Sequence, residues 1–169
     1  MKRIGLFFGK YTVKTAIVAK KIQKAFGETK IDVISIEEAW LKEFEAYDYI
    51  IAGTATWFDG ELPSYWDEII PLLSTINLKN KKVAIFGLGD QVNYPDNFVD
   101  GIGLLAEAFK SAGAKIVGST SMEDYQFNQS RASDTDRFSG LAIDIENQPD
   151  KTDKRIRDWV EKLKKEFQI

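Results

Sequence analysis

Residues 3–27 read RIGLFFGKYTVKTAIVAKKIQKAFG and place a strand, a loop and a helix in immediate succession. The first six residues are almost continuously apolar, which is typical of a strand buried on both faces of a parallel sheet. Residues 13–26 carry apolar side chains at helical spacing, and Gly27 supplies a stop signal. This unit, repeated along the chain, predicts an α/β fold with right-handed crossovers.

The rest of the chain repeats the pattern. We expect a short irregular helix after the second strand, and Thr152 is predicted to cap the last helix. One domain, 1–169, accounts for the whole length. A long polar segment, 121–138, interrupts the fifth strand and is either functional or partly structured. The remaining strands are expected at 31–36, 49–53, 82–87 and 115–118 with a resumption at 141–145, and the remaining helices at 63–73, 98–112 and 152–167.

Composition excludes several classes of function. The chain has no cysteine and no histidine, so thiolate nucleophiles, Ser-His-Asp catalysis and most zinc sites are excluded, and a bound cofactor is the favoured source of chemistry. A net charge of −3 argues against a nucleic-acid partner. No apolar run approaches the roughly 20 residues that span a membrane, so we expect a cytoplasmic protein.

The loop after the first strand has the features of a phosphate site. Free backbone N–H groups and the helix dipole favour an anion at such a helix N-terminus. Taken alone, the loop is equally an ordinary turn with a threonine cap. A P-loop NTPase is excluded because its motif needs glycine directly before the lysine, where this chain has Val13. Hydroxyl donors and positive charges come from Thr12, Thr15, Lys10 and Lys14.

Two further loops carry aromatic side chains at the predicted carboxyl ends of strands. Trp57 follows the third strand and Tyr94 the fourth, where Gly89-Asp90 gives a tight turn. Trp57 alone could pack on a neighbouring helix. Ligands of open parallel sheets bind beyond the carboxyl ends of strands, where the strand order reverses. An anion cradle with aromatics on two loops therefore predicts a ligand with a phosphate tail and a flat ring.

Several blocks in the same order resemble the long-chain flavodoxins, and the resemblance runs essentially end to end. It implies a flavodoxin-like doubly wound five-stranded parallel sheet of order 2-1-3-4-5, with helices on both faces and the fifth strand split by an insertion. The matching blocks are GLFFG at 5–9, Thr56-Trp57 with Gly60-Glu61-Leu62, GLGDQ at 87–91 with Tyr94, Tyr125-Gln126-Phe127 in the insertion, and GLAID at 140–144 with Asn147-Gln148.

The resemblance also implies FMN as a non-covalent cofactor, with no metal and no catalytic residue. Trp57 would stack on the inner face of the flavin ring and Tyr94 on the outer face, while Asp90 would meet the pyrimidine edge. The Phe58-Asp59 peptide would flip with the redox state. The residues expected to bind FMN are Lys10, Tyr11, Thr12, Val13, Lys14, Thr15, Thr54, Ala55, Thr56, Trp57, Phe58, Asp59, Gly60, Leu88, Gly89, Asp90, Asn93, Tyr94, Asn97 and Phe98.

The function implied is that of a low-potential one-electron carrier that substitutes for ferredoxin and has no substrate turnover of its own. Expected partners are ferredoxin–NADP reductase, photosystem I, nitrogenase or ferredoxin-dependent reductases. The chain is expected to be a monomer that docks to them transiently through electrostatic attraction. One alternative is an NAD(P)H-dependent quinone reductase of the same fold. A second is a response regulator, although this chain lacks the acidic pair that such a protein needs after the first strand. A third is a phosphate-binding relic that has lost FMN. Acidic residues beside the second loop are either a solvated helix face or a docking rim: Asp59, Glu61, Asp67 and Glu68.

Overall fold

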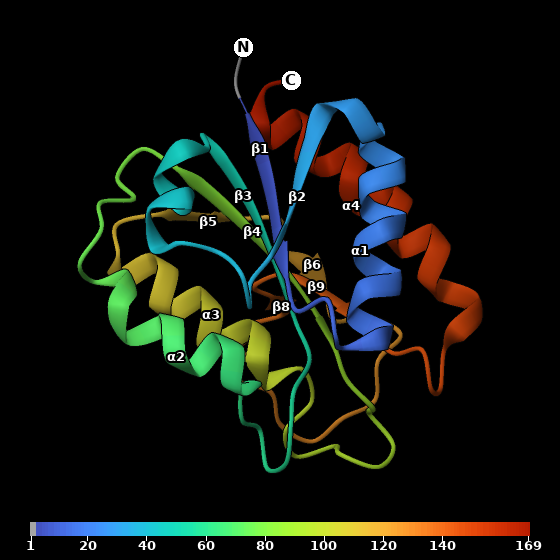
Figure 1. Ribbon diagram of the computed structural model, residues 1–169. Helices are drawn as coiled ribbons and strands as arrows, with labels where there is room; N and C mark the ends of the chain where they lie inside the picture. Colours follow the sequence, from blue (N-terminus) through green and yellow to red (C-terminus); the bar gives the residue numbers. More distant parts are fainter. Residues whose placement is uncertain (1–2) are drawn as a thin grey trace.

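The computed structural model describes residues 3–169 and is built on a parallel sheet (Figure 1). Its strand order is β2-β1-β3-β4-β5, with β9 also pairing with β4. Every residue of β1 and β3 is buried, as the apolar runs of both segments predict. The strands span Ile4–Phe8 (β1), Ile31–Ser35 (β2), Tyr49–Thr54 (β3), Lys82–Leu88 (β4), Lys115–Val117 (β5) and Leu141–Ile143 (β9).

Helices cover both faces of the sheet, as Figure 1 shows. One face packs against α1 (Val13–Phe26) and α4 (Thr152–Phe167), and the other against α2 (Ser64–Leu73) and α3 (Asp100–Ser111). Each face forms its own hydrophobic core. Three short 3-10 helices complete the connections, at Glu28–Lys30 (η1), Leu41–Ala46 (η2) and Pro149–Lys151 (η3).

The fifth strand is split, as predicted. β5 pairs with residues 82–84 of β4, and β9 pairs with residues 86–88. The segment between them is partly structured, because it holds a small antiparallel sheet of order β6-β8-β7. These strands span Thr120–Ser121 (β6), Ser133–Asp134 (β7) and Arg137–Phe138 (β8).

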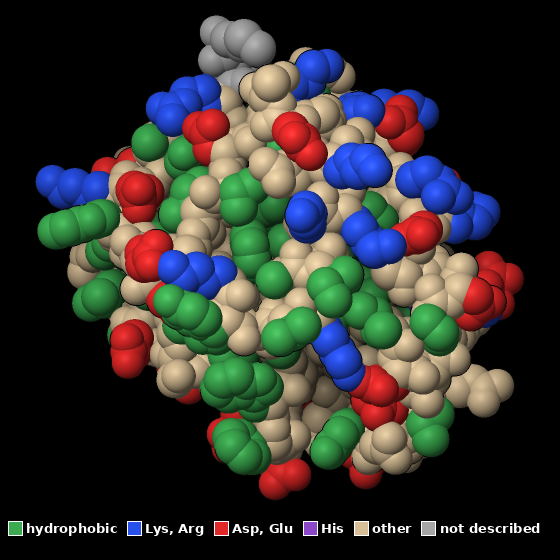
Figure 2. All heavy atoms as spheres, turned by 45° about the vertical axis from the view of Figure 1, so that its right-hand side comes forward, with side chains coloured by type: hydrophobic (Ala, Val, Ile, Leu, Met, Phe, Trp, Pro, Cys, Tyr) green, Lys and Arg blue, Asp and Glu red, His purple; other side chains and the backbone are tan. Residues whose placement is uncertain are grey.

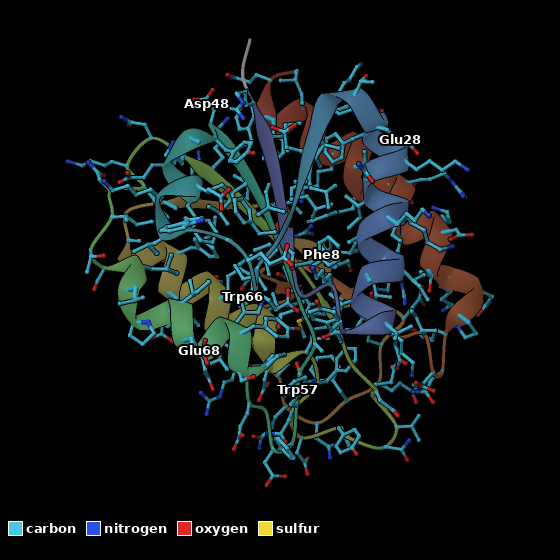
Figure 3. All side chains as sticks on the ribbon, viewed as in Figure 1. Phe8, Glu28, Asp48, Trp57, Trp66 and Glu68 are labelled. Atoms are coloured by element: carbon cyan, nitrogen blue, oxygen red, sulfur yellow. The ribbon has the colours of Figure 1, made fainter. Side chains whose placement is uncertain are left out.

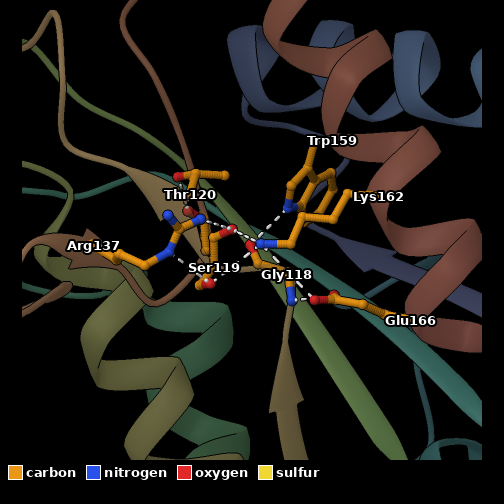
Figure 4. A network of polar contacts seen from close by, with 8 residues as sticks. Gly118, Ser119, Thr120, Arg137, Trp159, Lys162 and Glu166 are labelled. Carbon is orange, nitrogen blue, oxygen red and sulfur yellow. Dashed lines mark hydrogen bonds and ion pairs between the residues drawn. The ribbon is translucent and has the colours of Figure 1, made fainter.

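A polar network joins the start of the insertion to α4 (Figure 4). Trp159 Nε1 donates to the carbonyl of Gly118 at 2.8 Å, and the Gly118 N–H donates to Glu166 Oε2 at 2.7 Å. Arg137 and Lys162 both donate to the carbonyl of Ser119. Burial lowers the pKa of Lys162. These bonds satisfy backbone groups directly after β5 and connect this end of the edge strand to α4.

Three sequence predictions about helix starts are wrong, the first by one residue, since α2 begins at Ser64 and Pro63 is its N-cap. Thr152 does not cap α4: it is the first helical residue, and its buried hydroxyl has no hydrogen-bond partner among the described residues. Helix α3 begins at Asp100 rather than at residue 98, because Val99 has a left-handed backbone with φ of 47°. A β-branched residue seldom adopts that conformation, so the sequence gives no sign of it.

Candidate functional site

Loops after β1, β3 and β4 meet at one end of the sheet, which is the lower end in Figure 1. Two cavities of about 410 and 370 Å³ lie between these loops. Both are lined by Thr56, Gly89, Asp90 and Tyr94, so they form one continuous groove. Figure 2 shows hydrophobic side chains gathered around this end of the molecule. The groove lies where the strand order reverses between β1 and β3, which is the position predicted for a ligand.

The β1–α1 loop lines one end of the groove, which is called the phosphate end because the sequence predicts a phosphate there. Thr12 is the N-cap residue, and α1 begins at Val13 with a right-handed backbone, so a β-branched side chain is tolerated there. Thr15 lines the groove from the first turn of α1. Its hydroxyl is buried and has no hydrogen-bond partner among residues 3–169. A buried donor without a partner at a helix N-terminus fits a phosphate oxygen.

The two lysines of this loop are paired with carboxylates. Lys10 Nζ donates to Glu38, and this hydrogen bond raises the pKa of Lys10. Lys14 Nζ forms an ion pair with Glu146. Both pairs are exposed, so the loop carries little excess positive charge. The structure therefore puts hydroxyl and backbone donors at the phosphate end and leaves neither lysine unpaired.

A tyrosine that sequence reasoning missed supports the loop. The hydroxyls of Tyr65 and Thr12 lie 2.9 Å apart. When the phenol donates, the Thr12 hydrogen is left for a phosphate oxygen. Burial raises the pKa of Tyr65, which keeps the phenol protonated. Tyr65 also packs on Gly9, where an added Cβ would lie 2.3 Å from the ring, so Gly9 admits no side chain.

The ring end of the groove is lined by aromatic side chains that remain partly exposed. Trp57 is 37% exposed and Tyr94 is 57% exposed, and both line the larger cavity. Trp57 is fixed by a two-way backbone bridge to Glu61, with both N···O distances at 2.7 Å. Two rings on separate loops, open to solvent on the groove side, provide stacking surfaces for a flat ligand.

The turn between Trp57 and Glu61 is strained. Phe58 has a left-handed backbone with φ of 47°, although its side chain is 75% exposed. Gly60 has φ of +92°, and a Cβ there would lie 2.4 Å from Asp100 Oδ2, so only glycine fits. Asn97 Nδ2 donates to the carbonyl of Asp59 at 3.1 Å. The turn is thus held from α3's N-terminal side.

The loop after β4 is organised by two carboxylates. Asp90 accepts from the backbone N–H groups of Val92 and Asn93 at 3.1 and 3.0 Å. Burial raises its pKa, but hydrogen bonds from Asn93, Asn147 and Val92 outweigh that effect, and its net pKa is lowered. Asp144, fully buried, accepts from the backbone and side chain of Gln91 at 3.1 and 2.7 Å. Asp90 therefore shapes the loop, while the site role of Asp144 was not predicted.

Most of the predicted binding residues line the groove: Thr12, Val13, Lys14, Thr15, Ala55, Thr56, Trp57, Phe58, Leu88, Gly89, Asp90, Tyr94 and Asn97. Thr54 and Phe98 do not: both are fully buried, and Phe98 packs in an aromatic cluster with Tyr125, Phe127 and Phe138. The groove is also lined by residues that were not predicted, Ile145 and Glu146, which follow β9. The split fifth strand gave no signal for their position. The remaining predicted residues lie beside the groove: Lys10, Tyr11, Asp59, Gly60 and Asn93.

Comparison with known proteins identifies the family. The family model described as Flavodoxin matches residues 6–159. The chain belongs to the flavodoxin family. It is 48% identical to the flavodoxin of Synechococcus elongatus over 168 residues, and 43% identical to that of Klebsiella pneumoniae over 173 aligned residues. These alignments cover 99% of both proteins in the first case and 98% of both in the second.

A solved flavodoxin shares the whole fold. The crystal structure of Fusobacterium nucleatum flavodoxin bound to flavin mononucleotide matches with a TM-score of 0.92 and 32% identity, covering 98% of this chain and 99% of that chain. The predicted flavodoxin resemblance and the predicted sheet order are therefore confirmed. Within residues 3–169, no helix of this flavodoxin is both long and apolar enough to cross a membrane.

Proposed function

We propose that this flavodoxin holds FMN in the groove and carries single electrons between larger redox enzymes. Family membership confirms the predictions of an electron carrier, of FMN as cofactor and of a protein without its own substrate turnover, and it does not favour the quinone reductase. The buried, unpaired Thr15 hydroxyl beside a groove lined by two aromatic rings is the observation that carries the assignment.

The phosphate would be held by backbone N–H groups at the start of α1 together with the hydroxyls of Thr12 and Thr15. Trp57 and Tyr94 would enclose the flavin ring. Backbone groups of the loop that Asp90 organises would meet the ring's polar edge. The remaining predicted residues would complete the shell around these contacts. Bound FMN supplies the redox chemistry, and the chain binds, orients and shields it from water.

The chain's own charges would set how readily FMN takes up a negative charge. Asp59, Glu61 and Asp90 lie at or beside the ring end and carry negative charge near it. Carboxylates next to the ring disfavour a further negative charge there, which makes the reduced protein a strong electron donor. The Phe58-Asp59 peptide lies in the strained turn, so a change of its backbone conformation would start from a strained state.

The acidic rim would dock basic partners. Its four carboxylates are all exposed: Asp59, Glu61, Asp67 and Glu68. Exposed charge of one sign speeds diffusional encounter with a partner of opposite charge, which suits a carrier. We propose a cytoplasmic monomer that serves ferredoxin–NADP reductase, photosystem I, nitrogenase or ferredoxin-dependent reductases.

Fluorescence titration of FMN with the apoprotein tests the assignment. Stacking between the two rings should quench FMN fluorescence with a saturable curve, and the pure holoprotein should not oxidise NAD(P)H. Unquenched FMN would contradict cofactor binding in the groove. Rapid NAD(P)H oxidation would favour the quinone reductase instead.

A further inference from the structure

A third cavity, of about 460 Å³, adjoins the FMN groove. It shares Trp57 with the ring end and Thr12 with the phosphate end, but its other lining residues are different. It lies between the β1–α1 loop, the segment after β2 and the start of α2. The cofactor groove does not account for it.

The lining of this cavity combines aromatic rings with acidic side chains. It contains three aromatic rings, from Tyr11, Trp57 and Tyr65, and two carboxylates, from Glu37 and Glu68. The Trp57 and Tyr65 rings meet edge to face, with centroids 6.1 Å apart and planes at 83°. No lysine or arginine is among its lining residues in the described chain. Aromatic faces combined with carboxylates select an organic cation.

One carboxylate oxygen of Glu37 accepts no hydrogen bond from the described residues. Its Oε2 accepts from Ser35 Oγ at 2.6 Å and from the Lys10 N–H at 3.2 Å, whereas Oε1 is buried with no hydrogen-bond partner in residues 3–169. Burial raises the pKa of Glu37, but hydrogen bonds from Ser35 and nearby backbone N–H groups outweigh that effect, and its net pKa is lowered. The carboxylate is therefore ionised, and a buried ionised oxygen is costly without a donor.

Lys10, which precedes the lining residue Tyr11, already has a partner. Lys10 Nζ is bonded to Glu38 and lies over the Tyr11 ring, 5.0 Å from its centroid. Since no lysine or arginine lines the cavity, a cation that pairs with the Glu37 carboxylate there would have to come from another molecule. Glu68 belongs to both the cavity and the acidic rim, so the cavity opens on the surface assigned above to partner docking.

We propose that this cavity receives an arginine side chain of the redox partner, which stacks on the aromatic rings and pairs with Glu37 and Glu68. A guanidinium group is planar, stacks on aromatic faces and offers five N–H donors, so it suits this lining better than the compact ammonium of lysine. The inference rests on the proposed function, since the partner is the one that docks at the rim. It adds a specific anchor to a docking surface that otherwise acts through net charge alone.

Binding of N-acetyl-arginine amide to the FMN-loaded protein tests the cavity directly, with N-acetyl-lysine amide as the matched probe. NMR spectra should show a saturable shift of the Trp57 indole N–H with the arginine probe and a weaker one with the lysine probe. Glu37→Gln and Glu68→Gln should each weaken the arginine probe by about 2- to 5-fold, as expected for loss of one ion pair that solvent screens. Absence of a saturable shift at Trp57 would overturn the proposal.

Glu28→Gln is the control, because it removes the same charge far from the cavity. In Figure 3, Glu28 lies at the opposite end of the molecule from Trp57 and Glu68. Glu28→Gln should leave binding of the arginine probe unchanged. Glu37 also accepts a hydrogen bond from the backbone N–H of Lys10 in the β1–α1 loop, so Glu37→Gln could change FMN binding. The FMN affinity of this variant is therefore measured, and if it falls, the result for Glu68→Gln decides the test.

Calorimetry with a ferredoxin–NADP reductase then tests the source of the cation. Glu68→Gln should weaken this complex several-fold more than Glu28→Gln does, and the arginine probe should compete with the reductase. Equal effects of the two variants would mean that the complex depends on net charge alone, which would contradict an arginine anchor in the cavity. An arginine probe that binds without competing with the reductase would mean that the cavity binds a small molecule instead of the partner. Failure of the proposed function looks different, since the wild type would then not quench FMN fluorescence at all.

Discussion

The two ends of the groove that is proposed to hold FMN differ in their side chains and in their exposure. At the phosphate end, the Thr15 hydroxyl is buried and has no hydrogen-bond partner among the described residues, and Lys10 and Lys14 both form ion pairs. At the ring end, Trp57 and Tyr94 remain partly exposed, and the turn beside them is strained at Phe58. The phosphate end thus offers a buried hydroxyl donor, while the ring end keeps exposed aromatic surface beside a strained turn.

The largest effect should come from removing the ring end's tryptophan. Trp57→Ala should weaken FMN binding by roughly 30- to 150-fold, because it removes about 2–3 kcal/mol of apolar burial and stacking. Fluorescence titration measures the change. Trp40→Ala is the control, since Trp40 is 80% exposed and lines neither part of the groove. Equal losses of FMN affinity in the two variants would mean that Trp57 does not contact FMN.

The next largest effect should come from the phosphate end. Thr15→Val should weaken FMN binding by roughly 10- to 30-fold, because the loss of one hydrogen bond to a charged group costs about 1.5–2 kcal/mol. Thr152→Val is a matched control, because Thr152 is also buried with an unpaired hydroxyl but lies at the start of α4. Both apoproteins should be at least as stable as wild type, since neither loses a protein partner. If Thr15→Val bound FMN normally, its hydroxyl would not face the phosphate.

The strain at the ring end should appear as a smaller effect on stability. Phe58→Gly should stabilise the apoprotein by about 1 kcal/mol, because glycine adopts a positive φ without steric cost and little burial is lost. Urea unfolding measures the difference. Phe58→Ala keeps a Cβ and should give no such gain. A destabilised Phe58→Gly would mean that the exposed ring makes contacts that outweigh the strain.

The smallest effect should come from a charge that the sequence points to. Lys10→Gln should change FMN affinity less than about threefold, because the ammonium group pairs with Glu38 at the surface. Titration at two ionic strengths tests this, and the salt dependence should match that of the wild type. A clear fall in affinity that grows at low salt would mean that Lys10 leaves Glu38 for the phosphate.

Sequence reasoning recovered the elements whose signals are local. The bounds of α1 and α4 follow from apolar periodicity, and Trp57, Tyr94 and Thr15 follow from their place after strands. It failed where the cause is tertiary. The pairing of Lys10 with Glu38 joins residues 28 positions apart, and the Thr12–Tyr65 contact joins residues 53 apart. The left-handed Val99 is set by its surroundings, so the late start of α3 could not be predicted.

The affinity of the wild-type apoprotein for FMN relative to riboflavin, at low and high ionic strength, tests most directly whether hydroxyl and backbone donors hold the phosphate. Riboflavin offers the same ring without the phosphate. We predict that FMN binds far more tightly and that added salt does not reduce its advantage, because neither lysine of the loop is unpaired. An advantage that collapses as salt is added, or equal affinity for the two ligands, would contradict this account of the phosphate end.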